Sequence, residues 1–179
     1  GSNSTVIECT FYLNEATAAA GDGGAVYSQN HNWTFNTCTF SDNTAGGDGG
    51  ACYEVAGTGL QTFNHCTVVF NTAGAQGGGL WTNASSPQIS FIGSIIADNK
   101  AATAQDVYSV SSTGMLSNDF NLVGTGDNAM VTWAASDNVG TDPTRICSKV
   151  LPIQDNGAGL LTHNLNSCSE ARDAGDPLA

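Results

Sequence analysis

The sequence has very few basic residues. Lys and Arg together number 4 in 179 residues, against 16 Asp and Glu, and the formal net charge is −12. A protein that tracks nucleic-acid phosphates needs a basic face, so we expect no nucleic-acid partner. The same charge disfavours adsorption to an anionic membrane. No apolar run reaches the length of a transmembrane helix, so we expect no direct membrane insertion either.

The sequence also lacks a signal peptide. Gly1-Ser2 resembles the remnant of an expression tag, and the repeated pattern described below begins almost at once. We therefore expect a fragment of a longer protein, whose targeting signal is not included. The acidic residues are spread along the chain rather than clustered, which is typical of a soluble protein that is extracellular or works at high salt.

What the chain does have is a motif that recurs four times. Cys-Thr-Phe at 9–11 and 38–40 becomes Cys-Thr-Val at 66–68 and Ser-Ile-Ile at 94–96, and Asn follows each triplet after two further residues. The triplets start 29, 28 and 28 residues apart. A period of this size indicates one supersecondary unit that buries its apolar face only against stacked copies of itself.

The residues between the motifs identify the unit. Apolar and small polar residues alternate over short runs that Gly, Asn, Asp and Ser interrupt, which indicates strands and turns. Three short strands per repeat are typical of one coil of a parallel β-helix. A leucine-rich repeat needs recurring Leu, and a helical repeat needs more than the 11% charged residues found here. We predict an all-β fold: a right-handed parallel β-helix (solenoid) of four to five coils over residues 3–124, with residues 125–179 as an irregular C-terminal cap of the same domain.

In such a solenoid, equivalent residues of successive coils stack about 4.8 Å apart. Residues two apart on one strand share a face, so we expect two inward columns, which contain Cys9, Cys38, Cys66 and Ser94, and Phe11, Phe40, Val68 and Ile96. A third column lies where the strand ends, and its amides are expected to bond the turn backbone of the adjacent coil; it contains Asn14, Asn43, Asn71 and Asn99. An outward column then contains Thr10, Thr39, Thr67 and Ile95. An aromatic column that fits core or surface equally well contains Tyr27, Tyr53 and Trp81.

The cysteines can be interpreted from this arrangement. Side chains stacked in one column point in parallel, which is poor geometry for a disulfide, so we expect Cys9, Cys38 and Cys66 to be small buried apolar residues. A zinc site would need converging ligands, and no His shares the column. Cys147 and Cys168 lie beyond the repeats and are the only pair that we consider for a disulfide.

Two resemblances to known families follow from the motifs. Phe-x-x-Asn at 11–14 and 40–43 alternates with Gly-Gly-Ala-Val at 23–26 and Gly-Gly-Ala-Cys at 49–52. Over residues 5–110, this pattern resembles the repeats of chlamydial-type polymorphic outer membrane proteins and related right-handed parallel β-helix proteins. Later stretches resemble the C-terminal region of bacterial choice-of-anchor surface proteins, namely 120–124, 151–157 and 173–177. The resemblances imply a secreted or surface-displayed bacterial protein, commonly adhesive, and bring no catalytic residues.

Parallel β-helices also include polysaccharide lyases and hydrolases. A lyase needs a Lys or Arg base, and the chain has only Lys100, Arg145, Lys149 and Arg172. A hydrolase needs two carboxylates aimed at one bond. Asp22 and Asp48 occupy equivalent turn positions. We expect no cofactor, with Ca²⁺ held by this pair and backbone carbonyls as the alternative. No Ser–His–Asp spacing is recognisable.

The function that the sequence favours is a non-catalytic bacterial β-helix segment, surface-displayed or secreted, that serves as an adhesin or binding scaffold. Its partner would be a host protein, a glycan or a second copy of the chain, and the sequence does not choose among them. The alternative is a polysaccharide-binding or polysaccharide-degrading β-helix. A further alternative is an ice-binding solenoid that uses the outward Thr column, although the second row that an ice face needs is interrupted by Tyr12, Ser41 and Val69. We expect an extracellular or cell-surface location.

Overall fold

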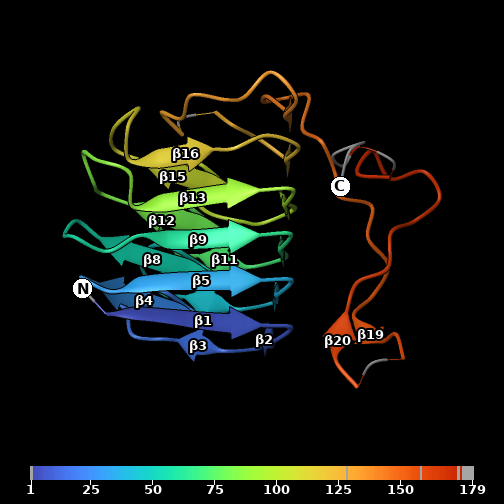
Figure 1. Ribbon diagram of the computed structural model, residues 1–179, viewed down its shortest axis with the longest axis horizontal. Coiled ribbons are helices and arrows are strands. Elements are labelled where there is room, and N and C mark those ends of the chain that lie inside the picture. The colour runs from blue at the N-terminus through green and yellow to red at the C-terminus, as the bar shows by residue number, and fades with distance from the viewer. Residues whose placement is uncertain (1, 128, 158, 173, 175–179) are drawn as a thin grey trace.

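The computed structural model describes residues 2–127, 129–157, 159–172 and 174. Within these residues the chain forms strands and no helix, and so it contains no helix long and apolar enough to cross a membrane. Successive turns of the chain stack on one another with their strands in parallel register (Figure 1). This arrangement confirms the all-β parallel β-helix predicted from the repeat.

Each side of the solenoid is one parallel sheet, and each sheet takes one strand from successive coils. The first sheet contains β1 (Asn3–Ile7), β5 (Asn32–Asn36), β9 (Gln61–Asn64), β13 (Ile89–Ile92) and β16 (Met115–Ser117). The second contains β2 (Thr10–Tyr12), β6 (Thr39–Ser41), β10 (Thr67–Val69), β14 (Ile95–Ala97), β17 (Leu122–Val123) and β18 (Asn138–Val139). The third contains β3 (Glu15–Ala16), β7 (Thr44–Ala45) and β11 (Thr72–Ala73). The fourth contains β4 (Val26–Gln29), β8 (Cys52–Val55), β12 (Leu80–Thr82) and β15 (Val107–Ser109).

Each coil changes direction at single residues in the left-handed conformation. Two columns of such residues have φ between 51° and 60°, namely Glu8, Thr37, His65 and Gly93, and Leu13, Asp42, Phe70 and Asp98. A third corner has φ of 69°, 66° and 61° at Gly23, Gly49 and Gly77. The left-handed conformation costs a non-glycine residue about 1–2 kcal/mol. The hydrogen-bonded columns that follow these corners offset this cost.

The core consists of stacked side chains from the first, second and fourth sheets. The Phe11 and Phe40 rings stack with centroids 4.5 Å apart and an interplanar angle of 1°. Phe35 and Phe63 stack at 5.1 Å, and Phe35 meets Phe40 edge-on at 5.2 Å. Fully burying one such side chain stabilises the fold by about 1.5–3 kcal/mol. In the next two coils, the strand register places Val68 and then Ile96 in the same column as Phe40.

The cysteine column is buried everywhere except at its first member. Cys38 and Cys66 are each 1% exposed, and Ser94 continues the column at 1%. Cys9 is exposed, so the prediction that it is buried is wrong. Cys9 belongs to the first coil, and within the described residues no coil covers its outer side. Cys52 is also fully buried, and burial raises the pKa of its thiol.

The C-terminal region has two parts. Val131, Trp133 and Val139 pack against the end of the core, where β18 pairs with β17. The chain then turns back along the side of the stack. It forms the antiparallel pair β19 (Gln154–Asp155) and β20 (Leu161–Thr162). We call residues 148–157 and 159–170 the strap; Figure 1 shows it beside the stack, with β19 and β20 level with the first coils.

The strap lies over the outward face of the second sheet. Ser148 N–H donates to the Asp98 carboxylate at 2.8 Å, and the Thr10 hydroxyl donates to the Leu161 carbonyl at 2.7 Å. Thr39 is only 5% exposed. The outward Thr column is therefore covered by the chain itself. An ice-binding face at this column is contradicted, because such a face must lie open to solvent.

Candidate functional site

The Asn column forms a ladder of hydrogen bonds in which each Asn donates to the Asn of the next coil. Asn43 donates from its backbone N–H and its Nδ2 to Asn71 Oδ1, at 3.0 and 2.8 Å. Asn71 makes the same two bonds to Asn99 Oδ1, at 3.0 and 2.9 Å, and Asn14 makes them to Asn43. Asn43, Asn71 and Asn99 are fully buried. These three members therefore hold the stack together and present nothing to a ligand.

The ladder ends on the buried carboxylate of Asp106. Asn99 N–H and Nδ2 both donate to Asp106 Oδ1 at 3.0 Å. The other carboxylate oxygen accepts the Thr125 N–H at 2.9 Å and lies 3.8 Å from an Arg145 Nη. Burial raises the pKa of Asp106 to about 6, and its hydrogen bonds and Arg145 limit the rise. The carboxylate terminates the ladder, and a substrate does not reach it.

The two calcium candidates belong to a second ladder, at a turn. Asp48 N–H donates to Asp22 Oδ1 at 2.8 Å, and Gln76 N–H donates to Asp48 Oδ1 at 2.8 Å. Burial raises the pKa of the Asp48 carboxyl, and the charge of Asp22 adds to the rise. Among the described residues, no group of three or more His, Cys, Asp and Glu side chains converges on one point. Each carboxylate supports the backbone of the next coil, and calcium binding stays a prediction.

One carboxyl lies inside the stack. Glu54 is fully buried, and within the described part of the chain neither carboxyl oxygen has a hydrogen-bond partner. Burial raises the pKa of Glu54 to about 7, and the polar side chains of Ser28 and Gln61 limit the rise. Ser28 and Thr82 flank Glu54 in the same inward column. Glu54 is therefore a titratable residue of the core, and a substrate cannot reach it.

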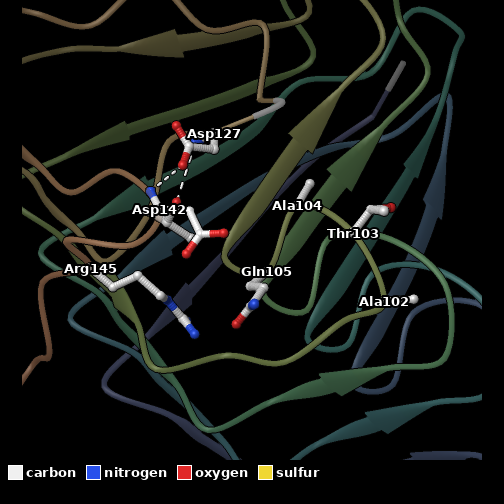
Figure 2. A pocket seen from close by; sticks show the side chains of 8 residues that line it. Ala102, Thr103, Ala104, Gln105, Asp127, Asp142 and Arg145 are labelled. Carbon is white, nitrogen blue, oxygen red and sulfur yellow. Dashed lines mark hydrogen bonds between the residues drawn. The ribbon is translucent and has the colours of Figure 1, made fainter.

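A small polar pocket opens at the C-terminal end of the stack. Figure 2 shows Asp127, Asp142 and Arg145 on one side of it and Gln105 on the other. The Asp142 N–H donates to the Asp127 carboxylate. The pocket volume is about 140 Å³, whereas pockets that enclose small ligands usually measure about 300–1,000 Å³. Two carboxylates are therefore close together here, but the space does not hold a sugar chain.

The structure also brings together a Ser–His pair that the sequence does not indicate. His163 Nε2 lies 3.0 Å from Ser41 Oγ, and its Nδ1 lies 2.7 Å from the Leu151 carbonyl oxygen. A serine nucleophile needs both an activating base and access to substrate. Ser41 is fully buried, and its hydroxyl donates to the Asp42 carboxylate at 2.6 Å. The pair thus fastens the strap to β6.

The two outer cysteines of the C-terminal region do not form the disulfide considered above. Cys147 and Cys168 are both free and exposed. The Cys168 thiol contacts the Asn166 side-chain oxygen at 3.2 Å. The hairpin of the strap is held by backbone pairing instead, including a bridge between Val150 and Leu165.

The coil that contains Cys38, Asn43 and Gly49 is the part of the chain that a comparison with known families recognises. Residues 37–53 match the Chlamydia polymorphic membrane protein (Chlamydia_PMP) repeat. The match is short and covers part of one coil, and together with the β-solenoid it fits a polymorphic-membrane-protein-like repeat protein. No curated protein and no solved structure matches the chain. The comparisons do not support the choice-of-anchor resemblance; residues 173 and 175–177 of that pattern lie outside the described residues.

The outward surfaces of this repeat are the remaining candidates for binding. On the fourth sheet, the aromatic rings form a continuous stack with centroid distances of 5.3, 4.2 and 6.1 Å, in the order Tyr27, Tyr53, Trp81 and Tyr108. Because each ring covers the face of the next, the column offers mainly ring edges. Tyr27 at the open end is 58% exposed. The column is therefore a rigid ridge rather than a row of open faces for sugar rings.

The first sheet carries an outward column that sequence reasoning missed. The strand register aligns Thr5, Thr34, Thr62 and Ser90. A parallel row begins with Ile7, which is 59% exposed, and continues with Asn36 and Asn64, whose amides are bonded at 2.8 Å. No other segment lies in front of this sheet in Figure 1. A signal was available, because Thr34, Thr62 and Ser90 each immediately precede an inward Phe.

Proposed function

We propose that this chain is a non-catalytic scaffold of the bacterial cell surface that binds its partner through the outward face of the first sheet, as an adhesin does. The matched repeat takes its name from membrane proteins, which supports a location at the outer membrane or cell surface. The observation that carries the proposal is the uncovered column of Thr5, Thr34 and Thr62 with its neighbouring Asn row. It is a polar face whose Thr hydroxyl recurs in the first three coils and whose Asn amide recurs in the second and third, in a row that begins with Ile7 and ends with Ile92.

The chemistry of this face suits an extended partner. Hydroxyl and amide groups each donate and accept hydrogen bonds, and the coils repeat them at about 4.8 Å. A long glycan or a protein surface can meet the same groups at several coils, so that many weak contacts add up. A small molecule would contact one coil only and would find no enclosed pocket there.

The non-catalytic part of the proposal is supported by the partners of the charged side chains. Arg145 faces Asp106, and the Lys149 ammonium lies 3.9 Å from Glu170. Asp22 and Asp48 accept backbone N–H groups. Arg145 also lines the pocket that contains Asp127 and Asp142, but a volume of about 140 Å³ leaves no room for a sugar chain there. Incubation with a panel of acidic polysaccharides tests this directly, and measurable chain cleavage would overturn it.

The binding face is tested with matched arginine variants. Beads coated with the protein are exposed to immobilised glycans and extracellular proteins, and retention is measured. Thr34→Arg and Thr62→Arg place a long charged side chain on the flat face, and we expect retention to fall about tenfold or more. Gln29→Arg makes the same charge change at an exposed position of the fourth sheet and should leave retention unchanged. Equal loss in all three variants, or no retention on any surface, would contradict the proposal.

A further inference from the structure

Three hydrogen-bonded contacts join the strap to the second sheet and its corners. Ser148 donates from its backbone N–H and its hydroxyl to the Asp98 carboxylate. The Leu161 carbonyl accepts the Thr10 hydroxyl at 2.7 Å, and the His163 imidazole contacts β6 at 3.0 Å. Asp98 follows β14 of the fourth coil and Thr10 begins β2 of the first. The strap therefore crosses the sheet from one end to the other, as Figure 1 shows.

The strap contributes almost nothing to the hydrophobic core. Among its described residues only Ser148 and Ser169 are buried, and none belongs to the core cluster. Its Leu151, Leu161 and Leu165 side chains are 38%, 39% and 39% exposed. Burial of apolar side chains is the dominant stabilising term in folding, so the strap is held less firmly than the coils beneath it. Segments of this kind open locally while the rest of the molecule stays folded.

The strap can move as one unit because its own hydrogen bonds close it into a hairpin. The Leu151 N–H donates to the Asn164 carbonyl at 2.7 Å, and the Asn166 N–H donates to the Lys149 carbonyl at 3.0 Å. Nearer the hairpin tip, β19 and β20 form an antiparallel pair. Opening therefore breaks the contacts with the second sheet and leaves these internal bonds intact.

The face beneath the strap is a hydroxyl column like that of the first sheet. The strand register aligns Thr10, Thr39 and Thr67 on the outward side of β2, β6 and β10. The strap shows which groups this face binds, because the Thr10 hydroxyl donates to a backbone carbonyl and the Ser41 hydroxyl meets the imidazole of His163. Backbone carbonyls and polar side chains in this arrangement belong to an extended polypeptide.

We propose that the outward face of the second sheet is a binding face for an extended polypeptide, and that the strap is a lid that occupies this face until a partner polypeptide replaces it. The partner offers a backbone carbonyl to Thr10 and a hydrogen-bonding side chain to Ser41, as Leu161 and His163 do in the closed state. The apparent dissociation constant of the partner is then its intrinsic constant divided by the open fraction. The inference does not depend on the first-sheet face.

Opening is measured with a thiol placed beneath the strap. Ser41→Cys puts one at a fully buried position of β6, and maleimide labelling read by mass spectrometry compares it with exposed Cys147 and buried Cys66. The new thiol should react at least about tenfold more slowly than Cys147 and at least about tenfold faster than Cys66. Asp98→Ala removes two hydrogen bonds and should speed its labelling about tenfold. Glu8→Ala, at an exposed carboxylate that is also in the left-handed conformation, should not.

Binding is measured with a fluorescent synthetic peptide of residues 150–166. This peptide contains the hairpin but lacks Ser148, so Asp98→Ala alters only the competing strap of the protein. Fluorescence anisotropy should show the peptide binding the Asp98→Ala protein about tenfold more tightly than the wild type, because the open fraction rises by that factor. In the Asp98→Ala background, Thr39→Arg should weaken binding about tenfold or more. Thr34→Arg, the same change on the first sheet, should leave it unchanged.

A variant peptide tests the same contact without altering the protein. The peptide with His163→Ala loses the hydrogen bond to Ser41 and should bind about threefold more weakly or worse. A scrambled peptide of the same composition should not bind.

Five results would overturn the proposal. If the Ser41→Cys thiol reacts only as fast as Cys66, the strap does not open on its own; if it reacts as fast as Cys147, the strap does not cover the face. No saturable binding to the Asp98→Ala protein up to about 1 mM peptide, or equal binding of the scrambled peptide, would remove the polypeptide site. A concentration-dependent dimer that Asp98→Ala promotes would make the strap of a second copy the occupant.

Discussion

The buried Asn ladder makes a quantitative prediction at its centre. The Asn71 side chain accepts two bonds from Asn43 and donates to Asn99 Oδ1 and to the carbonyls of Phe40 and Val69. Asn71→Ala removes all five and leaves the buried Asn43 N–H without its partner. A stranded buried group costs about 1–3 kcal/mol, and each lost bond about 0.5–1.5 kcal/mol. Because the donors and acceptors are shared, we expect a net loss of about 3–5 kcal/mol in the free energy of unfolding.

The same ladder provides the control. Asn14→Ala is the identical substitution at the exposed first member, which donates to Asn43 and accepts nothing within the described residues. It should cost less than about 1 kcal/mol, because water replaces the lost partner. Urea denaturation followed by far-ultraviolet circular dichroism gives both values. If Asn71→Ala and Asn14→Ala destabilise the protein equally, the ladder does not carry the stability assigned to it here.

Three further predictions concern the titration of Glu54, the residues in the left-handed conformation and the accessibility of the cysteine thiols. The pKa of Glu54 is raised to about 7 from its usual 4.5, so the folded state binds this proton more tightly than the unfolded state. Stability should then fall as pH rises from about 4.5 to about 7 and level off above. Glu54→Gln should remove most of the fall between pH 6 and 7 in urea titrations, because Asp106, whose pKa is raised to about 6, contributes the smaller share there; an unchanged fall would exclude Glu54 as its main source. At Gly49, with φ of 66°, an added Cβ would lie 2.6 Å from the Cys52 carbonyl oxygen. Gly49→Ala should therefore cost about 1–3 kcal/mol, whereas Ala104→Gly, at a residue with φ of 51°, should be neutral or stabilising; equal losses in guanidine denaturation would refute this account. Maleimide labelling of the folded protein, read by mass spectrometry, should modify only the exposed thiols, which are those of Cys9, Cys147 and Cys168. Rapid labelling of Cys38 would contradict the inward column.

The regular part of this fold is predictable because each coil repeats the contacts of the coil before it. A 28-residue spacing fixes which residues meet, so the placement of Phe40 above Val68 and of Asn71 beside Asn99 follows from the period alone. The outward Thr column of the first sheet could have been found in the same way. It was missed because the Cys-Thr-Phe motif drew attention to the neighbouring strand, one corner further along the chain.

The ends of the stack and the strap are not periodic, so the repeat does not predict the contacts of their residues. Cys9 has the same sequence context as Cys38, yet it is exposed because it lacks a coil on one side. The contact between Thr10 and Leu161 joins residues 151 positions apart, and no repeat relates them. Asp106 takes over the ladder only seven residues after Asn99, outside the register of the column. Such features depend on how the stack begins and stops, which local sequence does not encode.

The direction of the Asn ladder determines in what steps such a protein can change length. Asn43 and Asn71 are 28 residues apart and have the same donors and acceptors. Deleting residues 44–71 would therefore let Asn43 bond directly to Asn99, and every column would close up without a gap. Deleting a single residue would instead turn inward side chains outward along the rest of that coil. For the inward columns, whole coils are thus interchangeable units of gain and loss, whereas the strap, which is fixed at Asp98 and at Thr10, would have to shift by one coil.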